Sequence, residues 1–371
     1  MTEGIRKDLP KYKQIENELR SRITLGTYKP GERIPSETDL GEQFGVSRLT
    51  IQKSLKELQT DGLVERRAGS GTYVCPQKDA RGHLFGLMIP GLGETEIFEP
   101  VCQGMAKAGR VEGHALLWGD TAHGSSDIEF RTRQLCEDYI ARGVSGVFFA
   151  PIEGIPNKDS INTAITDMLT RAGIPIVLLD RCILPYPNRS RFDCVGIDNR
   201  RAGYRMGQHL IQCGARRPLF LAKQHSAPTV DARRVGFLEA VAAAGLNIRG
   251  GSVICDPSDT KAVAAILDEF KADAFLCAND ITAVHLMQSL ETLKVKVPDQ
   301  VKVVGIDDVR YASHLRVPLT SLHQPCLEMG ETAIGVMLSR IDKPALPARD
   351  VLIDCRIVVR QSCGSANGKQ N

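Results

Sequence analysis

The chain has 371 residues, of which 42% are hydrophobic and 25% are charged, and its formal net charge is only +3. This length predicts two or three folding units, and the composition is that of an ordinary globular protein with enough apolar residues for a large core. So small a net charge gives by itself no argument for a nucleic-acid partner. The N-terminal segment lacks the apolar core of a signal peptide, and no apolar run approaches the ~18 residues of a membrane-spanning helix, so we expect a cytoplasmic protein.

The eleven cysteines follow neither a disulfide pattern nor a metal-binding pattern. The nearest two are Cys355 and Cys363, there is no CxxC motif, and several, such as Cys277, lie inside apolar runs. We therefore expect reduced thiols that pack as small hydrophobic side chains. No HExxH motif and no Cys/His cluster suggests zinc, and we expect neither a metal ion nor a cofactor.

Three helices are predicted in the first 62 residues. Over residues 12–24, apolar residues recur at steps of three and four and share one face: Tyr12, Ile15, Leu19 and Ile23. A second helix begins after Ser36, which forms a capping-box pattern with Asp39, and Gly45 ends it. A third begins after Ser47 and ends at Gly62, and three residues form its buried face: Ile51, Leu55 and Leu58.

A hairpin follows, with strands over residues 63–66 and 72–74 and a turn at Gly69, Ser70 and Gly71. This order of elements is typical of a winged helix-turn-helix that binds DNA. Four side chains lie in the first two turns of the third helix, off its apolar face: Arg48, Thr50, Gln52 and Lys53. Arginine can bind guanine and glutamine adenine, and a helix N-terminus favours phosphate. A helical dimerisation module with a hairpin, or a merely solvated basic helix, is the alternative.

The segments PGERIPSE, FGVSRLTIQKSL, DGLVERR and GSGTYV stand in the order and spacing of the GntR family, and the first 74 residues resemble its winged helix-turn-helix. The resemblance implies that Arg33 contacts the phosphate backbone and that Glu37 supports the motif. It also places Ser47, Arg48, Thr50 and Gln52 on the DNA and residues 69–71 at the wing tip. Family members often carry arginine where Gln52 stands, so we expect a different base preference.

From residue 84 onward, short apolar runs alternate with helical segments in two series. This alternation predicts an α/β fold of two doubly wound lobes, each with a parallel sheet covered on both faces. Helices are expected over 232–244, 282–294 and 328–340, and a last strand over 351–360. Residues 75–82 are polar and show no helical pattern, so we divide the chain into a DNA-binding domain (1–74), a linker (75–82) and a two-lobed domain (83–371).

Polar residues follow several of the apolar strands, where open α/β sheets bind ligands: Asp180, Asn279, Asp280, Asp307 and Asp308. Each is alternatively a helix cap or a turn residue. Residues 84–364 resemble the LacI-type effector domain, which is related to periplasmic sugar-binding proteins, in segments such as PIVLLDR, RVGFLEA, FLCANDITA and VVGIDDVRYASHL. The resemblance implies two lobes joined by three crossovers and these cleft residues: Asp180, Arg233, Asn279, Asp307 and Gln324. We add Phe98 as a stacking or lid residue, and expect His323 to be structural and Trp118 to pack.

The combination of a GntR-type head with a LacI-type sensor is similar to the arabinose repressors of Gram-positive bacteria. We therefore expect a sequence-specific repressor that acts as a homodimer on a pseudo-palindromic operator and is released by a monosaccharide, with arabinose or another pentose as first choice. A sugar-responsive activator or a corepressed regulator has the same sequence features. A sugar-modifying enzyme with a fused DNA-binding domain is disfavoured, because Glu96 breaks the dinucleotide-binding pattern and no P-loop or GxSxG motif occurs.

Overall fold

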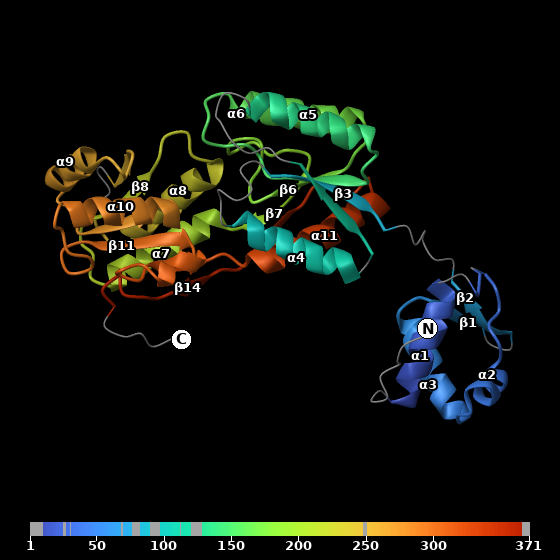
Figure 1. Cartoon of the computed structure of the whole chain (residues 1–371). Coiled ribbons are helices and arrows are strands. Elements are labelled where there is room, and N and C mark those ends of the chain that lie inside the picture. Colours follow the sequence, from blue (N-terminus) through green and yellow to red (C-terminus); the bar gives the residue numbers. More distant parts are fainter. Residues whose placement is uncertain are drawn as a thin grey trace. The chain divides into compact units, whose positions relative to one another are not determined.

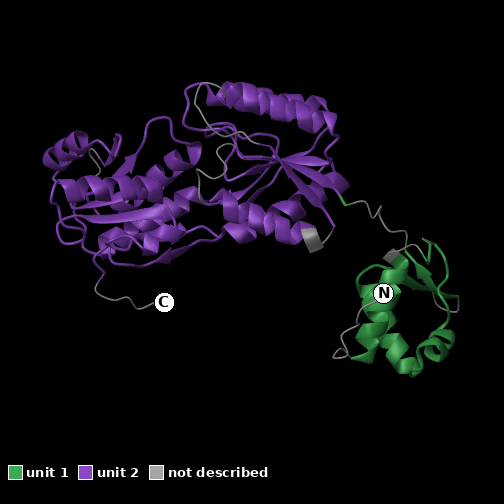
Figure 2. Ribbon diagram, in the orientation of Figure 1, with its two compact units in different colours: residues 1–82 green, residues 83–371 purple. Residues whose placement is uncertain are grey.

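The computed structural model describes residues 10–24, 27–29, 31–67, 70–75, 82–89, 97–111, 113–119, 128–247 and 251–365. The chain divides into two compact units, residues 1–82 and residues 83–371 (Figure 2). None of the described helices is long and apolar enough to cross a membrane.

The smaller unit contains three helices and a hairpin: α1 (Lys11–Thr24), α2 (Glu37–Phe44), α3 (Arg48–Thr60), β1 (Val64–Arg67) and β2 (Gly71–Val74). Its core is formed by the predicted apolar faces, with Leu19, Ile51 and Leu55 fully buried. The predicted capping box at the start of α2 is present, and Ser47 caps α3. Local sequence signals thus account for the start and end of α2 and the start of α3.

The hairpin differs from the prediction at its turn. Gly71 is already paired with Arg67 in the β1–β2 ladder, so it belongs to the strand, and Gly69 lies outside the described residues. Gly71 has φ +122°, and a Cβ atom at this position would lie 2.5 Å from Nε of Arg33. The positive φ favours glycine here, and a side chain would in addition displace Arg33, which lies against the strand.

The first lobe of the larger unit is a parallel six-stranded sheet in the order β13-β7-β6-β5-β3-β4. Its strands are β3 (Leu84–Met88), β4 (Ala115–Trp118), β5 (Gly146–Phe149), β6 (Ile176–Leu179), β7 (Asp193–Ile197) and β13 (Asp350–Ile353). One face is covered by α5 (Ile128–Ala141) and α6 (Lys158–Arg171) and the other by α4 (Phe98–Val111) and α11 (Cys326–Asp342) (Figure 1). Trp118, on the edge strand β4, is 65% exposed, so the prediction that it packs in the interior is wrong.

The second lobe is a six-stranded sheet in the order β14-β12-β11-β10-β8-β9, parallel except for β14. Its strands are β8 (Pro218–Ala222), β9 (Ser252–Ile254), β10 (Ala274–Cys277), β11 (Lys302–Asp307), β12 (Thr320–His323) and β14 (Arg356–Val358). Its helices are α7 (Asn199–Gln212), α8 (Pro228–Ala243), α9 (Thr260–Phe270) and α10 (Asp280–Thr292), with a 3-10 turn at Arg310–Ser313. The helix expected at 232 begins at Pro228, since proline suits the first helical turn.

Three crossovers join the lobes: β7 to α7, β12 to α11, and β13 to β14. The single strand expected over 351–360 is therefore wrong. It breaks at Asp354 and Cys355, and its halves add to opposite lobes, β13 beside β7 and β14 beside β12. An apolar pattern predicts a strand but does not say which sheet edge receives it, and here both β7 and β12 offered an edge.

Candidate DNA-binding surface and ligand cleft

Glu37, at the start of α2, holds together three basic or polar side chains of the smaller unit. Its carboxylate accepts hydrogen bonds from Arg48 Nε at 2.8 Å and Gln52 Nε2 at 2.9 Å, and forms an ion pair with Arg66 of β1. Burial opposes ionisation of Glu37, but the hydrogen bonds from Arg48 and Gln52 and the charge of Arg66 outweigh it, so its pKa lies below the ordinary value. One carboxylate thus orients the α3 side chains and ties them to the hairpin.

A groove surrounds this network, between α2, the start of α3 and the hairpin. It is lined by four arginines and a single carboxylate: Arg33, Arg48, Arg66, Arg67 and Glu37. The Arg48 side chain is 72% exposed despite its bond to Glu37. A concave surface with this excess of guanidinium groups suits a polyanion, since arginine binds phosphate and guanine through its planar fork.

The N-terminus of α3 is open. Ser47 Oγ accepts a hydrogen bond from Thr50 N at 3.4 Å and lies 2.9 Å from Thr50 Oγ1, so the two hydroxyls sit together over the first turn. Leu49 lies between them in sequence and is 77% exposed, which is unusual for a large apolar side chain. An exposed leucine at this end of a helix can contact the methyl group of thymine.

Between the two lobes of the larger unit lies a cavity of about 160 Å³. The first lobe contributes Phe98, Glu153, Asp180 and Arg181, and the second contributes Thr229, Arg233, Asn279, Asp307 and Tyr311. Four aliphatic side chains complete the lining. The cavity lies at the carboxyl ends of the strands, as expected for open α/β sheets. It is smaller than the ~300–1,000 Å³ of drug-sized sites, so it suits a small ligand.

Arg181 organises the wall from the first lobe. Its Nε donates to Pro151 O at 2.8 Å, Nη1 donates to Asp180 Oδ2 at 2.8 Å, and Nη2 lies 3.3 Å from Glu153 Oε1. The guanidinium carbon is 5.8 Å from the centre of the Phe98 ring. Only 7% of Arg181 is exposed, so its charge is neutralised within the wall.

Arg233 and Asp307 form the opposite wall. Arg233 donates to Asn199 Oδ1 at 2.8 Å and to Ala278 O at 2.7 Å, and its Nη1 lies 3.9 Å from Asp307 Oδ1. Gln324, at the second crossover, donates to Asp307 Oδ1 at 2.7 Å. Burial raises the pKa of Asp307 to about 8, although the charge of Arg233 opposes it.

Two buried acceptors in this region have no hydrogen-bond partner among the described residues: Asp180 Oδ1 and Gln324 Oε1. A third, Glu16 Oε2 in the smaller unit, has an ion pair with Lys13 at 2.6 Å. A buried acceptor without a partner costs ~1–3 kcal/mol, and Asp180 lines the cavity, so its Oδ1 favours a ligand that carries hydroxyl or amine donors.

Both parts of the chain match known families. Residues 11–74 match the bacterial regulatory proteins of the gntR family, and residues 208–363 match the periplasmic binding protein-like domain. The arabinose metabolism transcriptional repressor of Geobacillus stearothermophilus is 27% identical, over 96% of this chain and 98% of its own length. The repressor of the same description from Halalkalibacterium halodurans is 25% identical, over 97% and 98%.

Solved structures agree with this assignment. A LacI family transcriptional regulator from Enterococcus faecium, with bound ribose, is 22% identical and covers 75% of this chain and 98% of its own, with a TM-score of 0.62. The transcriptional regulator CelR in complex with cellobiose is 23% identical and covers 89% and 100%, with a TM-score of 0.63. At these identities the likeness establishes the fold.

The chain is a transcriptional regulator that joins a gntR-family region to a periplasmic binding protein-like domain, and this domain has the fold of LacI-family regulators. The relatives reported above are named as regulators and not as enzymes.

In the GntR-type unit, the structure separates the predicted DNA-binding residues into groups. Arg33, Glu37, Arg48 and Gly71 line the groove, and Gln52 joins it through Glu37. Lys53 lies elsewhere, because its Nζ is 3.7 Å from the centre of the Tyr12 ring on α1. A side chain engaged in such a cation–π contact is a poorer candidate for direct DNA contact. Ser70 lies at the wing, where its Oγ is 2.7 Å from the hydroxyl of Tyr73.

In the LacI-type domain, five of the six predicted ligand residues line the cavity: Phe98, Asp180, Arg233, Asn279 and Asp307. Phe98 is 1% exposed, so it belongs to the buried wall and not to a lid. Gln324 does not line the cavity but orients Asp307. Sequence reasoning missed four polar residues of the wall: Glu153, Arg181, Thr229 and Tyr311. Only Arg181 had a signal, since it directly follows Asp180 at the end of an apolar strand.

The other polar residues that follow the strands have structural roles. Asn279 caps α10, with its Oδ1 accepting from Thr282 N at 3.0 Å, while it also lines the cavity. Asp280 is fully buried and accepts from Ser321 Oγ at 2.6 Å and Val309 N at 3.0 Å. Asp308 binds His323 at 3.0 Å and Arg360 at 2.6 Å, in line with a structural His323.

Proposed function

We propose that this regulator is a repressor that binds operator DNA through its GntR-type unit and leaves it when a small sugar binds between the two lobes. The observation that carries the proposal is the pair of sites on one chain: a groove rich in arginine beside an open helix N-terminus, and a small cavity between the lobes whose lining includes the unpartnered acceptor Asp180 Oδ1.

In the operator complex, Arg48 and Gln52 read bases in the major groove, and Ser47 and Thr50 contact the backbone at the start of α3. Arg33 binds phosphate beside the wing, where Ser70 and Gly71 approach the DNA. The exposed Leu49 adds an apolar contact that sequence reasoning did not include. Glu37 remains in place as the acceptor that positions Arg48 and Gln52.

In the cavity, Asp180 and Asp307 accept hydrogen bonds from sugar hydroxyls, while Arg233 and the amide nitrogen of Asn279 donate to them. Phe98 covers an apolar face of the ring. A pentose is the first choice, because the cavity is small and because two relatives are arabinose metabolism repressors and one structural neighbour holds ribose. A polar ring with several hydroxyls satisfies acceptors on both lobes at once.

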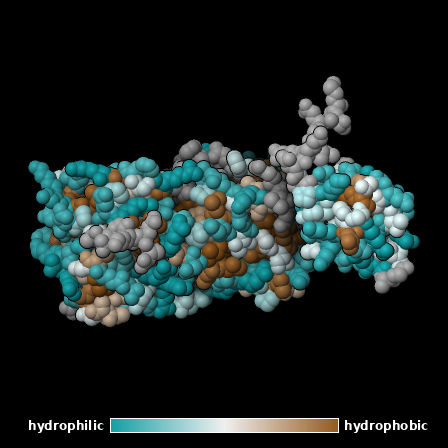
Figure 3. Space-filling model, turned by 90° about the horizontal axis from the view of Figure 1, so that it is seen from below, coloured by the Kyte–Doolittle hydropathy of each residue, from teal (hydrophilic) through white to brown (hydrophobic). Residues whose placement is uncertain are grey.

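We infer further that the protein is a cytoplasmic homodimer on a pseudo-palindromic operator, with residues 1–74 as DNA-binding domain, 75–82 as linker and 83–371 as effector and dimerisation domain. One face of the larger unit shows an area of apolar residues among hydrophilic ones (Figure 3), which is typical of a surface that associates. A two-fold dimer would present two α3 helices to two half-sites.

The test begins with a thermal-shift panel of free pentoses and hexoses on the full chain. A ligand at 100 times its Kd stabilises its domain by about 2.7 kcal/mol, which gives a clear shift. The sugar that binds is then titrated against the operator complex, and we expect operator affinity to fall by about 5–150-fold. A rise in operator affinity would instead make the protein a corepressed regulator or an activator.

A further inference from the structure

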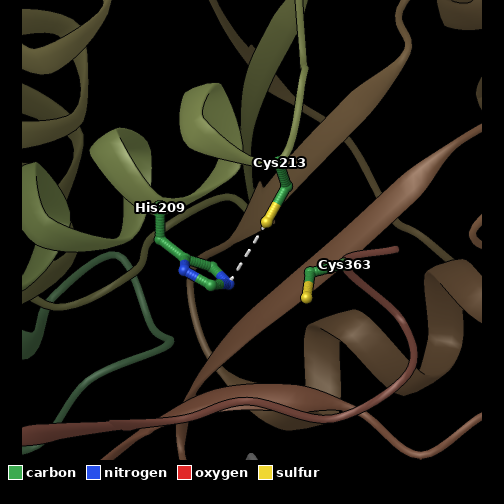
Figure 4. A group of neighbouring side chains, drawn as sticks. All are labelled: His209, Cys213 and Cys363. Atoms are coloured by element: carbon green, nitrogen blue, oxygen red, sulfur yellow. Dashed lines mark hydrogen bonds between the residues drawn. The ribbon is translucent and has the colours of Figure 1, made fainter. Parts of the chain in front are cut away.

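Three potential metal ligands from distant parts of the chain meet in the second lobe (Figure 4). His209 lies in the last turn of α7, Cys213 caps that helix, and Cys363 follows β14 near the C-terminus. One ligand atom from each lies within 4.8 Å of the other two, and in the described part of the chain no other three His, Cys, Asp or Glu side chains meet in this way. The sequence shows no such cluster, because only the fold brings Cys363 to α7.

Backbone hydrogen bonds hold both the His209–Cys213 pair and the residue next to Cys363 in place. His209 and Cys213 are four residues apart, so they share one face at the end of α7, and Cys213 N donates to His209 O at 3.0 Å. Cys363 is held by its neighbour Ser362, whose carbonyl accepts from Val303 N at 3.0 Å and whose Oγ accepts from Thr320 N at 2.8 Å. The ligand atoms are therefore positioned before any ion binds.

The spacing and chemistry of the three atoms suit zinc. In a tetrahedral site with Zn–S of about 2.3 Å and Zn–N of about 2.0 Å, sulfur and nitrogen lie roughly 3.6 Å apart. Cys213 Sγ and His209 Nε2, which face one another in Figure 4, are 3.6 Å apart. Sulfur and imidazole ligands favour zinc over magnesium or calcium, which prefer oxygen.

We propose that His209, Cys213 and Cys363 bind one Zn²⁺ ion, with a water molecule as the fourth ligand. Binding releases one proton from each thiol, so that two thiolates and a neutral imidazole balance the double charge of the ion. Cys363 is fully buried, whereas His209 and Cys213 are half-buried, so the ion has access from the α7 side. The ion would fasten the segment after β14 to α7, and none of its ligands lines the ligand cavity.

The test uses the full chain, reduced and freed of metal, and titrates Zn²⁺ against a competing chromogenic chelator. We expect one tight ion per chain and a rise in the melting temperature of the larger unit. Co²⁺ as a probe should give the visible bands of a tetrahedral site and a thiolate-to-cobalt charge-transfer band. Cys213→Ser and His209→Gln should each weaken binding by roughly a hundredfold or more.

Cys255→Ser is the matched control, because Cys255 is also a partly buried free thiol of the second lobe but lies outside the cluster. It should bind zinc as the wild type does. If Cys363→Ser lowers the stability of the protein by itself, the zinc affinities of the variants at the half-buried His209 and Cys213 still test the proposal. The proposal is overturned if Cys213→Ser binds zinc unchanged. It is equally overturned if the reduced protein takes up no ion and air oxidation instead joins Cys213 to Cys363 as a disulfide.

Discussion

Glu37 shows how one acidic residue can serve a surface that binds a polyanion. Its carboxylate lies among arginines that DNA would also attract, yet it holds Arg48 and Gln52 in a defined orientation. Orientation matters because each bidentate base contact contributes ~1–3 kcal/mol of discrimination only if the side chain reaches the base in the right geometry.

Glu37→Gln should therefore lower specific operator binding and raise non-specific binding. Specific affinity should fall by about 1–3 kcal/mol, as the two base-reading side chains lose their orientation. Non-specific affinity should rise, since one negative charge leaves the groove. Both affinities are measured at one salt concentration with operator and random DNA. Glu65→Gln makes the same charge change on β1, where the Glu65 carboxylate binds Arg67, and should leave the specificity ratio intact. Equal effects of the two variants would contradict an orienting role.

Asp307 and Asp308 are neighbours with opposite pH behaviour. Burial raises the pKa of Asp307 to about 8, so the folded state holds its proton more tightly than the unfolded state, whose value is about 3.9. Burial also opposes ionisation of Asp308, but hydrogen bonds from His323 and Arg360 outweigh it and lower its pKa.

The stabilising contribution of Asp307 should be complete below about pH 4 and decline as the pH rises towards 8. The wild type should therefore lose melting temperature relative to Asp307→Asn over this range. Asp308→Asn should behave in the opposite way, because the ionised Asp308 stabilises the fold above the unfolded-state pKa and that stability is lost only in acid. Thermal scans between pH 4 and 8 measure the effect of Asp307→Asn, and scans extended below pH 4 measure that of Asp308→Asn. A flat difference for Asp307→Asn between pH 4 and 8 would contradict its raised pKa.

At the scale of elements, the wing is built around the contact between β2 and Arg33. Gly71 has φ +122° and lies where a side chain would collide with the Arg33 guanidinium. Arg33 belongs to the segment before α2, and this contact holds its side chain beside the hairpin. Its backbone also forms an isolated antiparallel bridge with Tyr73 of β2.

Gly71→Ala should cost about 1–3 kcal/mol of stability from backbone strain and should also displace Arg33. The loss of one phosphate contact would reduce the salt dependence of DNA binding by about one unit of slope. Gly62→Ala is the matched control: it also has positive φ, at +71°, but a Cβ there meets nothing within 4 Å. We expect Gly62→Ala to lower the melting temperature without changing the slope. If both variants keep the wild-type slope, Arg33 does not bind phosphate.

At the scale of the whole molecule, the proposed function requires the sugar signal to pass between the two units, and we propose that the segment 75–82 carries it. We predict that four Gly/Ser residues inserted there leave operator and sugar affinities within about twofold, since each site lies within one unit. The effect of sugar on operator affinity should shrink, because a longer flexible linker relaxes the spacing of the two DNA-binding units. The same four residues added at the C-terminus should leave the effect of sugar on operator affinity unchanged. An undiminished sugar effect after the linker insertion would rule out spacing as the signal.

The sequence by itself determined the helix caps of α2 and α3, the winged-helix order and the two α/β lobes, because caps and apolar periodicity depend on neighbours a few residues away. It also indicated Asp180, Asn279 and Asp307, since strand ends of parallel sheets meet at one edge, whereas Arg233 was expected from the resemblance to the LacI-type domain. Tertiary structure alone decided which sheets receive β13 and β14 and that Trp118 is exposed. It also decided that Lys53 lies over Tyr12 and that Arg181 and Glu153 join the cavity wall. It alone brought His209, Cys213 and Cys363 together. These outcomes depend on which distant segments pack together, and a local pattern carries no information about that choice.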